Sequence, residues 1–269
     1  MGRSTRSYHA EIPRRLPAVA LLLLLAGAAA GCKTTTASNE ATGALAMATP
    51  ARSDAEWRSA ADAWGQRYRA NPNDAATAIQ YAQALRGLGQ RAQAVAVLER
   101  ASIQNPQNME LLGAYGRALA DVGHYQQALD VLNRAHTPDR PDWRILSVQG
   151  AVLDQMGRHE DAQRYYGTAL RMVPDEPSVL SNLGLSYALS KDLVRAELTL
   201  RRAAARAPND PRVRQNLALV LGLQGRFADA EAIARADLPP DEATANVAFL
   251  RQMIAQQQQQ NAAQARGRR

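Results

Sequence analysis

The residues of this chain that could carry out chemistry are few and far apart. The histidines are His9, His124, His136 and His159, and the only cysteine is Cys32. The sequence contains no HExxH zinc motif, no CxxC pair, no GxSxG nucleophile turn and no glycine-rich phosphate loop. The last three histidines fall at or beside turns between expected helices, so we expect solvated side chains there. The sequence therefore predicts no catalytic centre, no metal, no cofactor and no small-molecule substrate, and the protein is not expected to be an enzyme.

Cys32 stands at the end of a segment that has the order of a secretory signal. Residues 1–31 carry four arginines among the first 15 positions, continue in an apolar run with five consecutive leucines at 21–25, and close on three alanines and a glycine. This order indicates an export signal, and the run is too short for a good membrane span. The site resembles a bacterial lipobox, with Ala29 where leucine is usual. The resemblance implies that the Cys32 thiol carries a lipid.

An ordinary signal peptide cut near Ala30 would instead leave Cys32 as a free thiol. Such a thiol would be a liability in an oxidising compartment, which favours lipidation. Lys33 follows the cysteine, and in lipoproteins an aspartate there is the usual signal for retention at the inner membrane. We therefore expect a cell-envelope protein, anchored by lipid in the outer membrane and facing the periplasm. Residues 32–52 are rich in Thr and Ala, and we expect a flexible tether with a reach of roughly 25 Å.

The charge of the chain gives no argument for a nucleic-acid partner. Removal of residues 1–31 takes away four arginines and one glutamate, so the net charge falls from +7 to about +4. A charge that small, spread over the whole chain, does not indicate nucleic-acid binding.

Between residues 71 and 238 the sequence repeats with a period of 34 residues. Its clearest marks are the alanines at 94, 128, 162, 196 and 230. Four residues after each of the first four comes a large apolar side chain, at 98, 132, 166 and 200. Twelve residues before each alanine is another small residue, and five before it is usually a glycine (89, 123, 157 and 225). A fixed period of this size indicates a solenoid built from stacked units.

Each unit is predicted to be a hairpin of two helices that cross closely. The small residues allow the two backbones to approach, the glycines form the turn between the helices, and prolines at 106, 174 and 208 end the second helix. This pattern resembles the tetratricopeptide repeat over about two-thirds of the chain. The predicted fold class is all-α, a tetratricopeptide-repeat superhelical solenoid with a capping helix at each end. The resemblance implies a protein that binds other proteins.

These patterns divide the chain into six segments. They are a lipoprotein signal peptide (1–31), the lipid-anchored tether (32–52), an N-terminal capping helix or half-repeat (53–73), five repeat units (74–238), a C-terminal capping helix (239–255) and a disordered, Gln-rich basic tail (256–269). Trp57 and Trp64 share one face of the N-terminal helix. They would either close the end of the solenoid or form an aromatic surface for a partner.

The tetratricopeptide resemblance also implies a partner-binding groove, lined by fixed positions of the first helix of each unit. The predicted groove residues are Gln83, Arg86, Arg117, Asp121, Arg144, Asp154, Leu185, Leu189, Leu219 and Leu223. This groove would change from polar and charged to apolar along its length. Its apolar end would hold an amphipathic helix or a C-terminal peptide, or the chain's own C-terminal segment would fold back over the leucines.

The end of the repeat region goes beyond the general repeat pattern. Residues 216–238, followed by Ala245-Asn246-Val247-Ala248-Phe249-Leu250-Arg251, are similar to the end of the TadD family, the tetratricopeptide lipoproteins of the tight-adherence (Tad/Flp) pilus system. The resemblance implies an assembly factor or pilotin whose partner is the outer-membrane secretin or another pilus component. Two other functions stay open: a general envelope adaptor that recruits a protease or peptidoglycan hydrolase, and a scaffold in outer-membrane β-barrel assembly.

Overall fold

A computed structural model describes residues 53–266, and the predicted signal peptide, Cys32, the tether and residues 267–269 lie outside this range. The described part is all helical apart from its turns and one isolated bridge between Thr137 and Arg140. Its helices are α1 (Asp54–Ala70), α2 (Ala75–Gly87), α3 (Arg91–Gln104), α4 (Met109–Asp121), α5 (Tyr125–Leu132), α6 (Trp143–Gln155), α7 (His159–Met172), α8 (Pro177–Leu189), α9 (Leu193–Arg206), α10 (Pro211–Leu223), α11 (Phe227–Ala234) and α12 (Pro240–Arg266). The predicted all-α class is confirmed.

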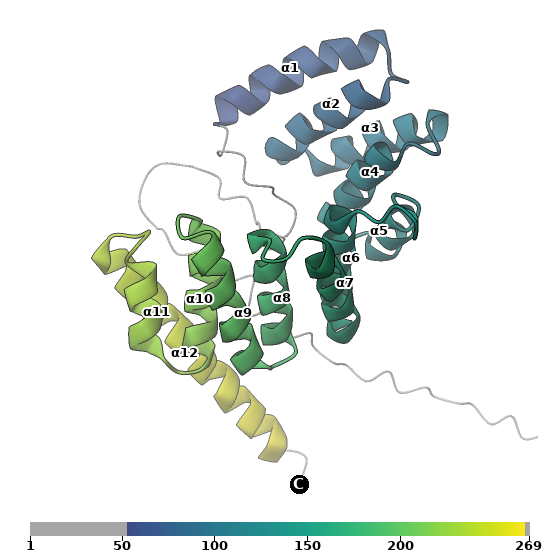
Figure 1. Ribbon diagram of the computed structural model, residues 1–269. Helices are drawn as coiled ribbons and strands as arrows, with labels where there is room; N and C mark the ends of the chain where they lie inside the picture. The colour runs from purple at the N-terminus through teal and green to yellow at the C-terminus, as the bar shows by residue number, and fades with distance from the viewer. Residues whose placement is uncertain (1–52, 267–269) are drawn as a thin grey trace, which may run out of the picture.

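The helices pack as antiparallel hairpins that follow one another along a curved array (Figure 1). The pairs α2/α3, α4/α5, α6/α7, α8/α9 and α10/α11 are the five predicted units. The first helices of consecutive units also contact one another, α2 with α4, α4 with α6, α6 with α8 and α8 with α10. The first helices therefore form an inner row, and the second helices lie outside it.

In the second, third and fourth units the close crossing depends on a glycine that faces a large side chain sixteen residues later. A Cβ atom on Gly116 would lie 2.5 Å from Leu132 Cγ, and one on Gly184 would lie 2.6 Å from Leu200 Cγ. These same Cβ positions are 3.3–3.4 Å from the backbone oxygens of the repeat alanines 128 and 196. The predicted packing of small residues against the second helix is therefore confirmed.

The turns inside the hairpins need a left-handed backbone. Gly89, Gly123, Gly157 and Gly225 have φ between +72° and +82°, where an L side chain is strained. In the fourth unit the same place is taken by Lys191, with φ of +67°. The turn of the fourth unit therefore has the same left-handed backbone although it has no glycine.

The N-terminal helix α1 starts at a complete capping box. Ser53 accepts a hydrogen bond from the Glu56 backbone N–H at 3.3 Å, and the Glu56 carboxylate accepts one from the Ser53 backbone N–H at 2.6 Å. Helix α1 then packs on α2, where the Trp57 ring lies so close to Gly87 that a Cβ there would be 2.3 Å from it. Trp57 therefore contributes to closing this end of the array.

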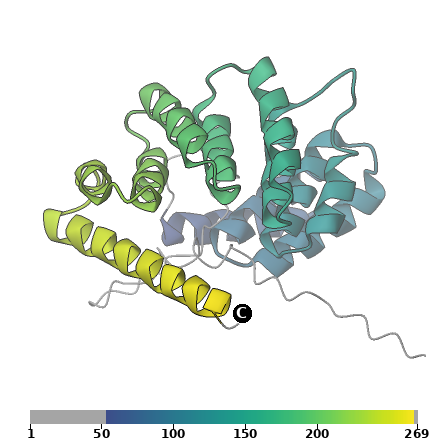
Figure 2. The same cartoon turned by 90° about the horizontal axis from the view of Figure 1, so that it is seen from below.

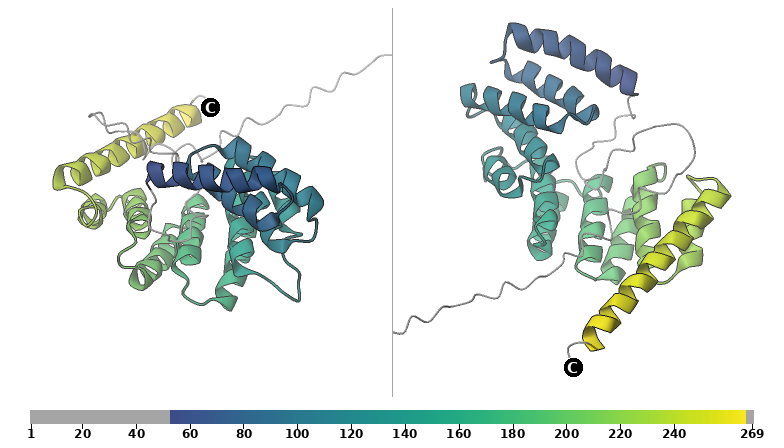
Figure 3. Two further views of the ribbon diagram at one scale, coloured as in Figure 1. Left: turned by 90° about the horizontal axis from the view of Figure 1, so that it is seen from above. Right: turned by 180° about the vertical axis from the view of Figure 1, so that it is seen from behind.

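The C-terminal helix is longer than the sequence predicted. A capping helix over 239–255 and a disordered tail from 256 were expected, but α12 continues to Arg266. No proline or glycine interrupts residues 241–266, and glutamine and alanine are good helix formers, so the Gln-rich composition does not prevent a helix. Helix α12 packs on α10 and α11 with its first half, and then extends obliquely past the array (Figures 2 and 3).

Candidate partner-binding surface

The inner row of helices is held together by polar contacts between side chains 35 residues apart. The Asn182 side-chain amide donates to Ser147 Oγ at 3.2 Å, and the Asn216 amide donates to Ser181 Oγ at 2.9 Å. Arg86 and Asp121 form an ion pair with the same separation. Since all three pairs join the first helices of consecutive units, part of the inner surface serves the stacking of the units.

The first three units place three arginines on this inner row. Arg86 is paired with Asp121, whose side chain is only 8% exposed. Arg144 is exposed, and its guanidinium lies over the Trp143 ring at 4.5 Å from the ring centroid. Burial lowers the pKa of Arg117, and so do the positive charges of Arg86 and Arg144, whereas the carboxylates of Asp142 and Asp121 raise it. This part of the surface therefore combines three arginines with two nearby carboxylates, of which Asp121 is already paired with Arg86.

Gln83 is the predicted groove residue on α2 next to Arg86 in the sequence pattern. Its side chain is exposed on α2. A partner can therefore reach Gln83 and Arg144 directly, whereas Arg86 and Arg117 are half-buried.

Asp154 does not line an open groove. It is 6% exposed, and its carboxylate accepts hydrogen bonds from Ser186 Oγ at 2.8 Å and from the Tyr166 hydroxyl at 3.1 Å. His159 Nδ1 lies 2.8 Å from the same carboxylate. Burial raises the pKa of Asp154, against the effect of these donors. Asp154 joins α6, α7 and α8 in the core, because the next unit covers it.

Two of the histidines expected to be solvated are instead partly buried. One is His159, which contacts Asp154. The other is His136, whose Nε2 lies 3.2 Å from Oε1 of the fully buried Gln149, while its buried Nδ1 has no hydrogen-bond partner. The expectation was wrong for both, because each ring contacts a buried polar side chain, His159 that of Asp154 in its own hairpin and His136 that of Gln149 in the next one. His124 is exposed, as expected.

The leucines predicted for the apolar end of the groove are not equivalent. Leu185 and Leu189 on α8 and Leu223 on α10 are half-buried. Leu219 is 7% exposed, so it belongs to the core, and its assignment to an open groove was wrong. The chain's C-terminal helix reaches α10 at this end, where Leu250 lies against Gly222. The apolar surface left on the inner row therefore centres on Leu185 and Leu189.

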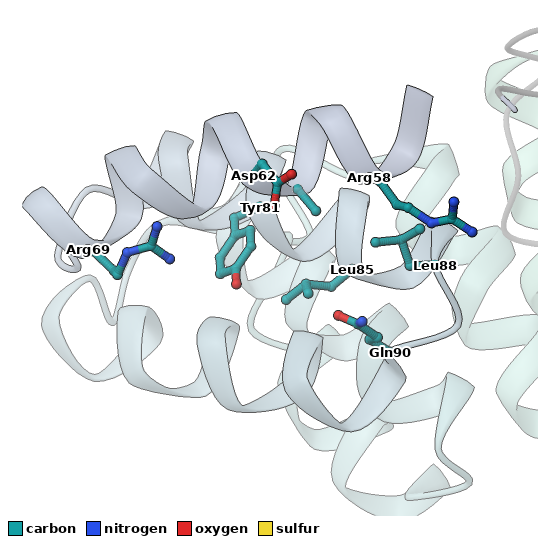
Figure 4. Close-up of a pocket in the computed structure, with 8 residues that line it drawn as sticks. Arg58, Asp62, Arg69, Tyr81, Leu85, Leu88 and Gln90 are labelled. Atoms are coloured by element: carbon teal, nitrogen blue, oxygen red, sulfur yellow. The ribbon is translucent and has the colours of Figure 1, made fainter. Parts of the chain in front are cut away.

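A shallow pocket of about 280 Å³ lies outside this inner surface, between α1 and α2 (Figure 4). Arg58, Asp62 and Arg69 border it from α1, and Tyr81 and Leu85 from α2. It contains none of the predicted groove residues. Within residues 53–266, no group of three or more His, Cys, Asp or Glu side chains is placed to hold a metal ion. None of the helices in the described part of the chain combines the length and the apolar character needed to cross a bilayer.

Comparison with protein families and solved structures now identifies the fold. The family model of the tetratricopeptide repeat matches residues 148–211, and that of subunit 3 of the anaphase-promoting complex matches residues 57–135. The chain has the tetratricopeptide-repeat fold. Solenoids of this fold present extended binding surfaces and are typical of non-enzymatic modules for protein–protein interaction.

Three solved structures illustrate the likeness. PilW, described as a widely conserved type IV pilus biogenesis factor, is 17% identical, with 72% of this chain and 91% of PilW covered and a TM-score of 0.64. The tetratricopeptide protein TTC0263 from Thermus thermophilus is 25% identical, with coverage of 66% and 98% and a TM-score of 0.57. A tetratricopeptide protein from Parabacteroides merdae is 18% identical, with coverage of 76% and 81% and a TM-score of 0.59. No curated protein matches the chain by sequence.

Proposed function

We propose that this protein is a lipid-anchored tetratricopeptide adaptor of the cell envelope that assists assembly of a Tad/Flp-type pilus from the outer membrane. The proposal combines the lipobox-like sequence at Cys32, the TadD-like sequence after Asn216 and the tetratricopeptide fold. PilW shows that this fold occurs in a pilus biogenesis factor, and at 17% identity its likeness concerns the fold alone.

The observation that carries the binding part of the proposal is the inner surface of α8. Leu185 and Leu189 are four residues apart and half-buried, on the same row of helices as the exposed Arg144. A pair of apolar side chains on the same row of helices as an exposed arginine suits an amphipathic partner segment with acidic residues at one end. We assign this segment to the outer-membrane secretin or to another pilus component.

The first experiment is a crosslinking pull-down of the tagged lipoprotein from envelope membranes. Recovery of a secretin or pilus component that depends on Cys32, tested with Cys32→Ser, would support the proposal. Recovery of a protease, a peptidoglycan hydrolase or the β-barrel assembly machinery without any pilus component would exclude the pilus assignment. In that case the binding solenoid would serve one of the two other functions considered above.

A pair of variants tests whether the partner lies on the inner row. Leu185→Glu with Leu189→Glu should reduce recovery of the partner more than tenfold, because two apolar contacts would be replaced by charges. The matched control is Ala92→Glu with Ala96→Glu, which makes the same spacing of charges on the outer helix α3. Equal recovery with both double variants would show that the partner does not use the surface of α8. Circular dichroism must show that both are folded.

A further inference from the structure

The outward side of α9 carries an apolar stripe that the repeat pattern does not require. Helix α9 buries Ala196, Leu200 and Ala203 against the solenoid. On the opposite side, Val194 is 69% exposed and Leu198 is 64% exposed. They are four residues apart and therefore adjacent on the helix surface. Burial of these side chains needs something outside the described chain.

Arginines border this stripe on both sides. At 100° per residue, Arg201 lies on one side of the line from Val194 through Leu198, and Arg202 lies on the other. Both arginines are about half exposed, at 49% and 54% of their side chains. We call Val194, Leu198, Arg201 and Arg202 the α9 outer face.

The carboxylates near this face are too few to neutralise it. Glu197 is shared by Arg201 and Arg226, both at 2.8 Å, and Asp175 is shared by Arg202 and Arg206. Arg226 is also paired with Asp229 at 2.6 Å, so four guanidinium groups meet three carboxylates. Glu197 and Asp175 are more deeply placed, with 17% and 26% of their side chains exposed against 42–58% for the arginines, whereas Asp229 is 52% exposed. The surface presented to a partner is therefore positive.

We propose that the α9 outer face docks on an anionic phospholipid surface. Val194 and Leu198 would enter the headgroup region, and the arginines around them would contact lipid phosphates. The positive charge of this face complements the negative charge of such a lipid surface. The lipid anchor of the proposed function, on which this inference partly rests, also favours a lipid surface. A tether of about 20 residues keeps the solenoid within roughly 25 Å of the bilayer, so a weak contact is sufficient. The inner row, on the other side of the hairpins, stays open to a protein partner.

Vesicle sedimentation with residues 33–269 tests this docking without the lipid. This segment contains every described helix and lacks the signal and Cys32. We expect binding to phosphatidylglycerol-containing vesicles at low salt, weaker binding at high salt, and little binding to pure phosphatidylcholine vesicles. Equal binding to both kinds of vesicle, or none to either, would overturn the proposal.

Two variants assign the binding to α9. Arg201→Gln with Arg202→Gln should weaken binding to anionic vesicles by about 30-fold, since each arginine near an anionic surface contributes about fivefold. Glu197 and Asp175 each keep a second arginine, so the fold should not change. Val194→Ser with Leu198→Ser should weaken binding at low and high salt alike.

The matched control lies on another outer helix. Arg100→Gln with Ile103→Ser removes one arginine and one apolar side chain that is 69% exposed on α3, and it should bind vesicles like the wild type. If the α9 variants also bind like the wild type, α9 is not the docking face. If they bind vesicles normally but no longer recover a protein that the wild type recovers in the pull-down, the face is a protein interface and the proposal is wrong. Vesicle binding does not depend on which pilus component is captured, so it can fail while the proposed function stands.

Discussion

Substitution of two glycines in the same hairpin by alanine should have opposite effects on stability. Gly150 lies in α6, and an added Cβ would be 2.7 Å from Cε1 and 2.8 Å from Cζ of Tyr166. Gly167 lies in α7, and its added Cβ would have no neighbour within 4 Å. The change in helix propensity is the same at both sites, about 1 kcal/mol in favour of alanine. The difference between the two variants therefore measures the packing at Gly150.

The Tyr166 ring cannot easily move away from a new methyl group. It is 1% exposed, and its hydroxyl donates to the buried Asp154 at 3.1 Å. Overpacking of a core typically costs about 1–3 kcal/mol, and a weakened buried hydrogen bond adds about 1 kcal/mol. Offset by the helix propensity, Gly150→Ala should lower the free energy of unfolding by about 2 kcal/mol. Gly167→Ala should raise it by about 1 kcal/mol.

Thermal unfolding followed by circular dichroism is the assay. A difference of about 3 kcal/mol corresponds to roughly 6–12 °C between the two variants in a domain of this size. A double-mutant cycle identifies the cause, because in a Tyr166→Ala background the cost of Gly150→Ala should disappear. The reasoning would be refuted by a Gly150→Ala protein as stable as the wild type, or by an unchanged cost without the Tyr166 ring.

Two further predictions concern single positions in the same solenoid. Lys191→Gly should raise the free energy of unfolding by about 1 kcal/mol in a denaturant titration, because it relieves a left-handed backbone at φ +67°; an unchanged midpoint would contradict this. Asp154→Ala should lower it by about 3 kcal/mol through loss of partners for buried donors, and Asp154→Asn should cost less. Burial raises the pKa of Asp154, so the folded state holds this proton more tightly than the unfolded state. The free energy of unfolding of the wild type relative to Asp154→Asn should therefore fall as the pH rises from the ordinary aspartate pKa through the raised one, and a rise would refute the assignment.

The sequence by itself was sufficient for the repeat architecture. The 34-residue period predicted the five hairpins, and the small residues predicted where the two helices of each hairpin cross. Gly116 against Leu132 and Gly184 against Leu200 confirm these crossings. Such features can be read from one sequence because each unit repeats the same local geometry, so one physical requirement recurs at a constant spacing.

The tertiary structure decided which side chains are available to a partner. The repeat position of Asp154 and Leu219 predicted groove residues, but packing of neighbouring elements buries both. The same position-based reasoning gave no reason to look at Val194 and Leu198, which the structure leaves exposed. The period specifies where a side chain stands in its unit. Whether that side chain is covered depends on the particular residues of the next unit and of the end helices, and these do not repeat.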